Sequence, residues 1–162
     1  MMNKVIVKGQ YMFVMKSYDD GMDSYKDKLS LNDAMRNYPE AMEELDKVLN
    51  EDKEFVFSIF KEQTGAIDVS FSMDENYSYM KYVFDHDVTK EEAEKIVEYT
   101  EGQYSDGWGE GIEQEELYKE TETYTETEEN EYGEEYDEYY ETEYILTFHL
   151  WFPSAKYTYI IE

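Results

Sequence analysis

The feature that most constrains the fold is the run from Glu113 to Glu143, in which acidic residues alternate with Thr and Tyr. From 120 to 128 every odd position is Thr, and the even positions are four Glu and one Tyr. A period of two with Thr and Tyr is typical of a β-strand, whereas a disordered acidic tract has no such period. Asn130 to Gly133 supply turn residues. The run therefore predicts a long acidic β-hairpin.

The second strand of this hairpin continues into apolar sequence. From 135 to 152, aromatic and aliphatic residues occupy most even positions, and the odd positions begin acidic. We interpret three even-numbered tyrosines as packing the hairpin onto the domain: Tyr136, Tyr140 and Tyr144. Three others are expected to make surface contacts: Tyr124, Tyr132 and Tyr139. The hairpin is therefore predicted to be continuous with the core sheet.

The rest of the chain predicts an α+β fold, with an antiparallel sheet and two or three helices. Residues 4–16 predict one bent strand or a tight strand pair, and residues 17–28 predict a loop. Ser30 with Asp33 indicates a helix start, the apolar spacing over 39–50 predicts a helix, and Thr89 with Glu92 predicts a capping box for a helix that Gly102 ends. Further strands are expected at 54–61, 66–73, 77–84 and 156–161, the first three as a meander.

Charge separates the chain into parts of one expected domain. The 162 residues include 41 Asp and Glu against 14 Lys and Arg, for a net charge of -27. The run 113–143 alone holds 15 acidic residues and one Lys. A chain with 17% aromatic residues is expected to fold despite this charge. We expect a core over 1–112, the acidic hairpin over 113–143 and core strands over 144–162.

This charge and the residue types present exclude several functions. Direct binding to nucleic acid or to an anionic membrane is excluded, because both would be repelled. The chain lacks Cys, so it has no thiol nucleophile or cysteine-ligated metal. Its two histidines, His86 and His149, are not placed together by any motif, and no hydrolase or metalloprotease motif is present. We expect neither an enzyme nor a metal or cofactor site.

A glycine-rich loop around Gly107–Gly111 is the remaining candidate for a site. It lacks the Gly-Lys-Ser/Thr ending of a phosphate loop, and its carboxylates would repel an anion. A structural loop is the preferred interpretation, although Trp108 could be a docking residue, with Asp106 and Glu110 extending the acidic surface. The N-terminus does not have the pattern of a signal peptide, and no stretch has the roughly 18 apolar residues of a membrane span. We therefore expect a cytoplasmic protein, located in the host cell cytoplasm if a phage encodes it.

The density of carboxylates on the hairpin suggests a basic partner. Alternate residues on a strand lie ~6.7 Å apart, and a second strand ~4.8 Å away doubles the density. Directly opposed like charges destabilise a sheet by ~0.2–1 kcal/mol per pair, and solubility needs a net charge of only ~2–8. Tyrosine adds contact area and can stack on arginine. The expected contact residues are Glu120, Glu122, Tyr124, Glu126, Glu128, Glu135, Asp137, Tyr139, Glu141 and Glu143.

In these respects the chain resembles the DNA-mimic inhibitors of phages and mobile elements, the class that includes anti-restriction and anti-CRISPR proteins. The resemblance rests on size, charge, the absence of Cys and the run Glu113–Glu143, and it implies no common fold and no catalytic residues. It implies a cytosolic protein whose carboxylates occupy the basic channel of a nuclease or another DNA-binding protein and exclude DNA.

Other interpretations remain open. The hairpin could be a solvated, protective edge, or the chain could be an acidic chaperone or adaptor that binds basic host proteins without inhibiting them. An enzyme using the Gly107–Gly111 loop would need a pocket there with a carboxyl group of raised pKa. A halophile-like surface fits less well, because the charge is clustered. The sequence leaves open whether the chain is a monomer or a homodimer.

Overall fold

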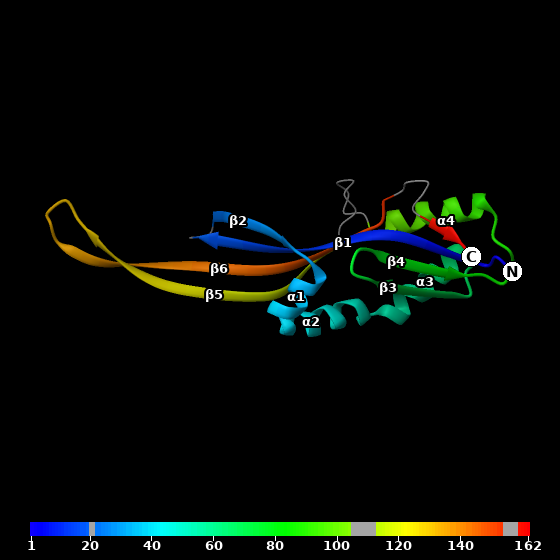
Figure 1. Cartoon of the computed structure of the whole chain (residues 1–162), viewed down its shortest axis with the longest axis horizontal. Helices are drawn as coiled ribbons and strands as arrows, with labels where there is room; N and C mark the ends of the chain where they lie inside the picture. Colours follow the sequence, from blue (N-terminus) through cyan, green and yellow to red (C-terminus); the bar gives the residue numbers. More distant parts are fainter. Residues whose placement is uncertain (20–21, 105–112, 154–158) are drawn as a thin grey trace.

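The computed structural model describes residues 1–19, 22–104, 113–153 and 159–162 as an α+β fold drawn out along one axis. Both termini lie at the end where α3 and α4 pack on the sheet, and a two-stranded ribbon extends away at the other end (Figure 1). The elements follow the order β1 (Lys4–Asp19), β2 (Met22–Leu29), α1 (Leu31–Asn37), α2 (Pro39–Asn50), α3 (Lys53–Thr64), β3 (Asp68–Met73), β4 (Ser78–Val83), α4 (Lys90–Gln103), β5 (Glu113–Glu129), β6 (Glu135–Trp151) and β7 (Tyr159–Ile161). The expected antiparallel α+β class is confirmed. The described residues form four helices, whereas the prediction was two or three.

Strand β1 is the spine of the sheet and changes partners along its length. Its first part, Lys4–Gly9, pairs with β4, and Val5–Val7 also pair with β7. Its second part pairs with β6 over residues 10–19 and with β2 over residues 13–19. All these pairings are antiparallel. The segment 4–16 is therefore one strand rather than a strand pair.

The core lies on the face of the sheet that the odd residues of β1 and the even residues of β6 share. Phe13 is paired with Phe148, their ring centroids are 5.4 Å apart, and both side chains are buried. Helices α3 and α4 meet through Phe60 and Tyr99, whose rings lie edge to face at 5.5 Å. This alternation places the apolar residues on one face and removes them from water, which is the main stabilising term.

Several helix boundaries follow the local signals in the sequence. The Ser30 hydroxyl accepts a hydrogen bond from the Asp33 amide and caps α1. Helix α2 spans Pro39–Asn50 as predicted, and Thr89 with Glu92 forms the predicted capping box at the start of α4. These signals are local hydrogen bonds and spacings, so they do not depend on the rest of the fold.

The strand predicted over 54–61 is wrong, because this segment is helix α3. Its run of Phe, Val and Ile favours a strand by propensity, but tertiary packing selects a helix. Phe60 is buried, while Phe55 is 68% exposed, so the apolar residues occupy more than one face. Gly65, predicted as a turn between two strands, instead ends α3 in the left-handed region with φ 79°.

The prediction of a loop over 17–28 is also wrong for the described residues of this segment. Strand β1 continues to Asp19, and β2 begins at Met22. The Asp and Ser residues here have low strand propensity, but β6 and β1 supply backbone partners that override it. The predicted strands over 66–73 and 77–84 are confirmed as β3 and β4, and the described part of the last predicted strand is β7.

Gly9 lies where β1 exchanges partners, and the close packing there generates a first prediction. A Cβ at this position would lie 2.5 Å from Phe152 Cδ1 and 2.6 Å from Ser78 Oγ. We expect Gly9→Ala to lower the free energy of unfolding by about 1–3 kcal/mol, because the ring of Phe152 must move. Urea denaturation of the full chain measures this.

Gly102→Ala is the matched control. A Cβ at Gly102 meets nothing within 4 Å, and the residue lies inside α4. This substitution should leave stability unchanged or raise it by about 0.4–1 kcal/mol. Equal losses for the two variants would contradict the close-packing argument.

The histidine at the start of α4 generates a prediction about pH. His86 Nδ1 lies 3.0 Å from Asp85 Oδ1, and Nε2 lies 2.7 Å from Glu92 Oε2. The bond to Asp85, followed by the bond to Glu92, raises the pKa of His86 above its usual 6.5. The same bonds lower the pKa of both carboxyl groups. The contribution of the imidazolium is therefore complete below pH 6.5 and is lost as the pH rises through the higher folded pKa.

We expect His86→Gln to lower the thermal midpoint more at about pH 5.5 than at about pH 8.5, because Asp85 and Glu92 are ionised at both. Circular dichroism melts of both proteins at the two pH values check this. A difference in midpoint that is larger at the higher pH would contradict the assigned ion pairs.

Candidate functional site

The candidate site is the outer part of the β5–β6 hairpin, residues 120–144, which we call the acidic ribbon. It leaves the sheet where Asp19, the last residue of β1, pairs with Thr142. Beyond that pair, among the described residues, β5 and β6 have only each other as strand partners, from Thr123 opposite Glu141 out to Glu129 opposite Glu135. The ribbon therefore projects into solvent with both faces open along its outer length (Figure 1).

The tip of the ribbon is closed by the predicted turn. Asn130 Oδ1 accepts hydrogen bonds from the amides of Tyr132 and Glu134, both at 2.9 Å. Gly133 adopts φ 76°, which glycine reaches without steric cost. The turn fixes which residues of the two strands lie opposite each other, and so it fixes the composition of each face.

Register divides the ribbon into two chemically different faces. Even residues of β5 lie opposite even residues of β6, and odd residues lie opposite odd residues. The even face carries Glu120, Glu122, Tyr124, Glu126, Glu128, Tyr136, Glu138, Tyr140, Thr142 and Tyr144. The odd face carries Thr121, Thr123, Thr125, Thr127, Glu129, Glu135, Asp137, Tyr139, Glu141 and Glu143.

The expected contact residues thus lie on one ribbon but not on one face. The four predicted glutamates of β5 are on the even face, and the four predicted acidic residues of β6 are on the odd face. Glu129 and Glu138 belong to the same surface, although the prediction omitted them. The predicted position of the turn could have identified both, because it places Glu129 and Glu138 on the two strands of the hairpin. Asp106, Trp108 and Glu110 lie outside the described residues.

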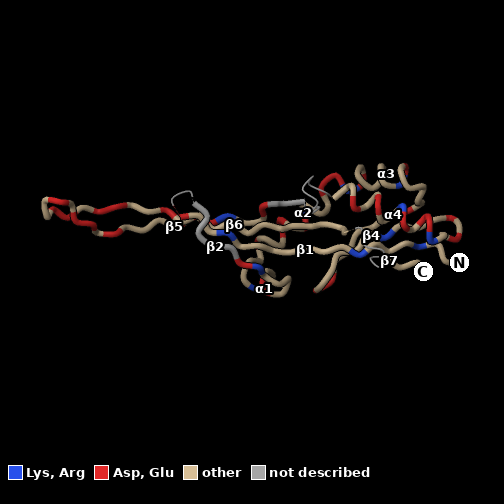
Figure 2. Tube along the Cα trace, turned by 90° about the horizontal axis from the view of Figure 1, so that it is seen from above, with Lys and Arg blue, Asp and Glu red and all other residues tan. Residues whose placement is uncertain are grey.

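The charge on the ribbon is high and almost unopposed. Ten carboxylates lie on ten residue pairs, a length of roughly 30 Å at about 3.4 Å per residue. This is about one charge per 3 Å, close to the one per ~3.4 Å of a single nucleic-acid strand. Within the described residues, its one ion pair joins Lys119 Nζ to Glu143 Oε1 at 3.4 Å. Figure 2 shows Asp and Glu along both strands to the tip.

Two pairs of carboxylates are directly opposed across the strands. Glu126 lies opposite Glu138, and Glu129 lies opposite Glu135. Such pairs destabilise a sheet. Backbone pairing and side-chain contacts offset the repulsion, and these contacts include Thr127 Oγ1 donating to Asp137 Oδ1 at 3.3 Å. A bound cation would relieve the repulsion and gain free energy.

Tyrosine side chains on the even face pack against each other and hydrogen-bond to a carboxylate. The rings of Tyr124 and Tyr140 are stacked, with centroids 5.3 Å apart and an interplanar angle of 19°. The Tyr140 hydroxyl donates to Glu128 Oε1 at 3.1 Å, which raises the pKa of Tyr140 to about 12. The hydroxyl is therefore protonated at neutral pH and holds the carboxylate in place. The prediction that Tyr140 packs onto the domain is wrong, because it packs across the ribbon, beyond the end of β1.

The other tyrosines divide by their place along the ribbon. Tyr144 pairs with Ser17 of β1 at the root and is half-buried there. Tyr136 is 46% exposed, so it does not serve the packing role predicted for it. Tyr124 and Tyr139 are 42% and 79% exposed, and Tyr132 at the tip is also exposed. These last three are exposed, as a surface contact requires, and the contact itself stays a prediction.

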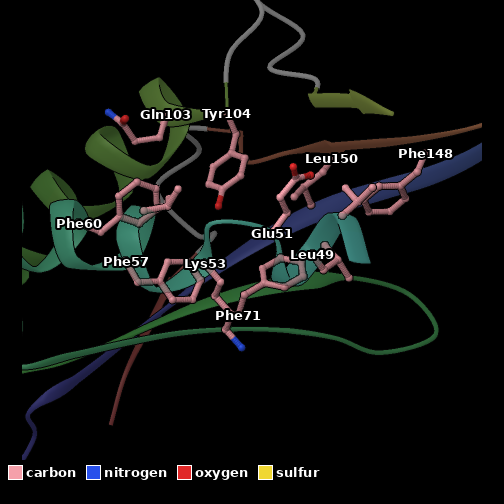
Figure 3. Close-up of a pocket in the computed structure, with 12 residues that line it drawn as sticks. Leu49, Glu51, Lys53, Phe57, Phe60, Phe71, Gln103, Tyr104, Phe148 and Leu150 are labelled. Atoms are coloured by element: carbon pink, nitrogen blue, oxygen red, sulfur yellow. The ribbon is translucent and has the colours of Figure 1, made fainter. Parts of the chain in front are cut away.

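A cavity of about 310 Å³ lies between α2, α3, the end of α4 and the sheet. Phe57, Phe60, Phe71, Phe148 and Leu150 form much of its wall, with Glu51 also on the lining (Figure 3). Among the described residues, every carboxyl group with a shifted pKa has it lowered. In the same part of the chain, no cluster of three potential metal ligands is present. The Gly107–Gly111 loop, on which the enzyme interpretation rests, lies outside the described residues.

The opposed carboxylates generate a prediction about the ribbon itself. Glu138→Lys would place an ammonium group opposite Glu126 and replace repulsion with attraction. We expect this variant to stabilise the ribbon by roughly 0.5–1 kcal/mol. Amide hydrogen exchange at residues 122–128, measured by NMR, should slow accordingly.

Glu141→Lys makes the same change of charge opposite Thr123 and is the control. Its effect should be smaller, because no carboxylate faces it directly. Equal protection in the two variants would mean that total charge, rather than direct opposition, destabilises the ribbon.

None of the helices in the described ranges is long and apolar enough to cross a membrane. No family model matches the chain, and neither a curated protein nor a solved structure matches it.

Proposed function

We propose that this protein is an acidic DNA mimic that binds a basic nucleic-acid-binding protein and keeps nucleic acid away from it. The observation that carries the proposal is the acidic ribbon, with ten carboxylates over roughly 30 Å. Their spacing along the axis is close to that of the phosphates of one nucleic-acid strand. Basic side chains placed to bind phosphates could therefore pair with these carboxylates instead.

The shape of the ribbon supports a channel as its target. Two strands lie only about 4.8 Å apart, so the ribbon is thin in one direction, and it carries charge on both faces. A flat basic surface would engage one face and leave the other unused. A channel that surrounds a nucleic-acid strand has basic walls on more than one side and could pair with both faces.

Electrostatic steering would bring the partners together. A surface of one sign attracts an opposite surface over a distance of about a Debye length, ~10 Å at 0.1 M salt. Association should be fast at low salt and fall steeply as salt is added. Inhibition would be stoichiometric, because the ribbon occupies the site and carries out no reaction.

The class of target we propose is a bacterial defence nuclease, either a restriction enzyme or a CRISPR effector. These enzymes hold nucleic acid in basic channels or clefts and therefore offer the chemistry that the ribbon fits. Such a target lies in the bacterial cytoplasm, so we propose that the protein acts there.

Competition with labelled DNA tests the proposal. A type I restriction endonuclease and a CRISPR effector nuclease, each bound to a fluorescent duplex target, are titrated with the full chain. We expect at least one to release its DNA at a one-to-one ratio, as followed by fluorescence anisotropy. The triple substitution Glu122→Gln, Glu126→Gln and Glu128→Gln should weaken this release about tenfold or more, mainly through the association rate.

The control carries three equivalent substitutions on the helices: Glu43→Gln, Glu62→Gln and Glu98→Gln. These residues are exposed, so the variant has the same net charge as the ribbon variant. It should inhibit like the unchanged protein. Binding without release of DNA would support the acidic chaperone or adaptor instead, and failure to bind either nuclease at low salt would contradict this proposal.

A further inference from the structure

The tyrosines of the acidic ribbon are not shared equally between its faces. The even face holds Tyr124, Tyr136, Tyr140 and Tyr144, whereas Tyr139 is the single tyrosine among the odd positions. On β5, the odd positions between the carboxylates are filled by threonine instead. Threonine is a good strand former, so a strand-forming role alone does not require tyrosine on the even face.

The even face presents an aromatic platform among carboxylates. Tyr124 and Tyr140 stack at 5.3 Å, and Tyr124 remains 42% exposed. One side of this pair is bordered by Glu122, and the other by the opposed pair Glu126 and Glu138. A planar cation resting on the platform would thus have carboxylates within reach on both sides.

Tyr136 extends this surface toward the tip. It lies opposite Glu128 and is 46% exposed. The carboxylate of Glu128 is fixed by the Tyr140 hydroxyl at 3.1 Å. The same face therefore repeats the combination of an exposed ring and a carboxylate along the strand.

This combination fits arginine better than lysine. A guanidinium group is planar and weakly hydrated, stacks on aromatic rings, and pairs with a carboxylate through two parallel hydrogen bonds. An ammonium group is a strongly hydrated point charge that gains less from a ring. Carboxylates alone, as on most of the odd face, do not distinguish the two.

We propose that the even face of the ribbon is a docking surface for arginine side chains of the partner, with Tyr124 and Tyr136 as the stacking residues. The inference rests on the proposed function and names the chemistry that the ribbon recognises. The even face then supplies selectivity for arginine, and the odd face supplies charge.

Binding of two peptides with equal charge tests this inference. Fluorescently labelled nona-arginine and nona-lysine are titrated with the full chain at low salt, and affinity is measured by anisotropy. We expect nona-arginine to bind about three- to tenfold more tightly. The double substitution Tyr124→Thr and Tyr136→Thr should remove most of that preference while changing the affinity for nona-lysine less than about twofold.

Tyr139→Thr is the matched control, because it removes an exposed ring from the odd face without changing charge. It should keep the preference for arginine. The single variant Tyr136→Thr leaves the stacked pair intact, so it should lower the preference without disturbing the ribbon. Unchanged amide exchange at residues 122–128 would verify that the ribbon is intact in each variant.

Three outcomes separate the two proposals. Equal affinity of the unchanged protein for both peptides would overturn the arginine inference and leave the proposed function standing. Loss of preference in Tyr139→Thr equal to that in the double variant would also overturn it. If the Glu122, Glu126 and Glu128 triple variant binds both peptides as tightly as the unchanged protein, the ribbon is not the basic-binding surface and both proposals fail.

Discussion

The pairing of β6 with β1 is the interaction on which the rest of the structure depends. One half of β6 is buried in the core through Leu146, Phe148 and Leu150, and its other half forms the acidic ribbon. Because side chains alternate along a strand, the buried half fixes which residues of the outer half face each way. A shift of β6 by one residue relative to β1 would move Phe148 out of the core and exchange the two faces of the ribbon. The core therefore supports the arrangement of the carboxylates at the root of the ribbon, and the turn at Asn130 to Gly133 supports it at the tip.

Repulsion within the ribbon is the cost of this arrangement, and it also explains how a basic partner would be bound. Glu126 and Glu138 face each other without a basic side chain between them, and residues 120–144 contain no Lys or Arg. Self-repulsion of this kind lowers the stability of the free protein. A partner that brings positive charge removes the repulsion and adds attraction. The free energy gained on binding therefore exceeds what a ribbon with internal ion pairs would gain.

How far the sequence predicts this fold depends on how local each signal is. The alternation of Thr and Glu from 120 to 128 identifies the hairpin, and Thr89 with Glu92 identifies the start of α4, because each signal is complete within a few residues. Residues 54–61 mislead, because an almost continuous apolar run has no single period. The two faces could not be predicted because they depend on register. A bulge between Glu116 and Tyr118 shifts the pairing, so the register of the inner part differs from that of the ribbon.

The same bulge connects the fold to the chemistry of the ribbon. Toward the domain from the bulge, Glu116 lies opposite Thr147, whereas beyond it Tyr118 lies opposite Leu146 and Glu120 opposite Tyr144. If the inner register continued outward, the threonines of β5 would share a face with Tyr140 and Tyr136, and most glutamates of β5 would share a face with Asp137 and Glu141. One face would then carry only Glu129 as a charge on the outer part of β5, and the other would carry most of the repulsion. The observed register instead spreads charge over both faces and places carboxylates beside exposed rings, a combination that fits a guanidinium group.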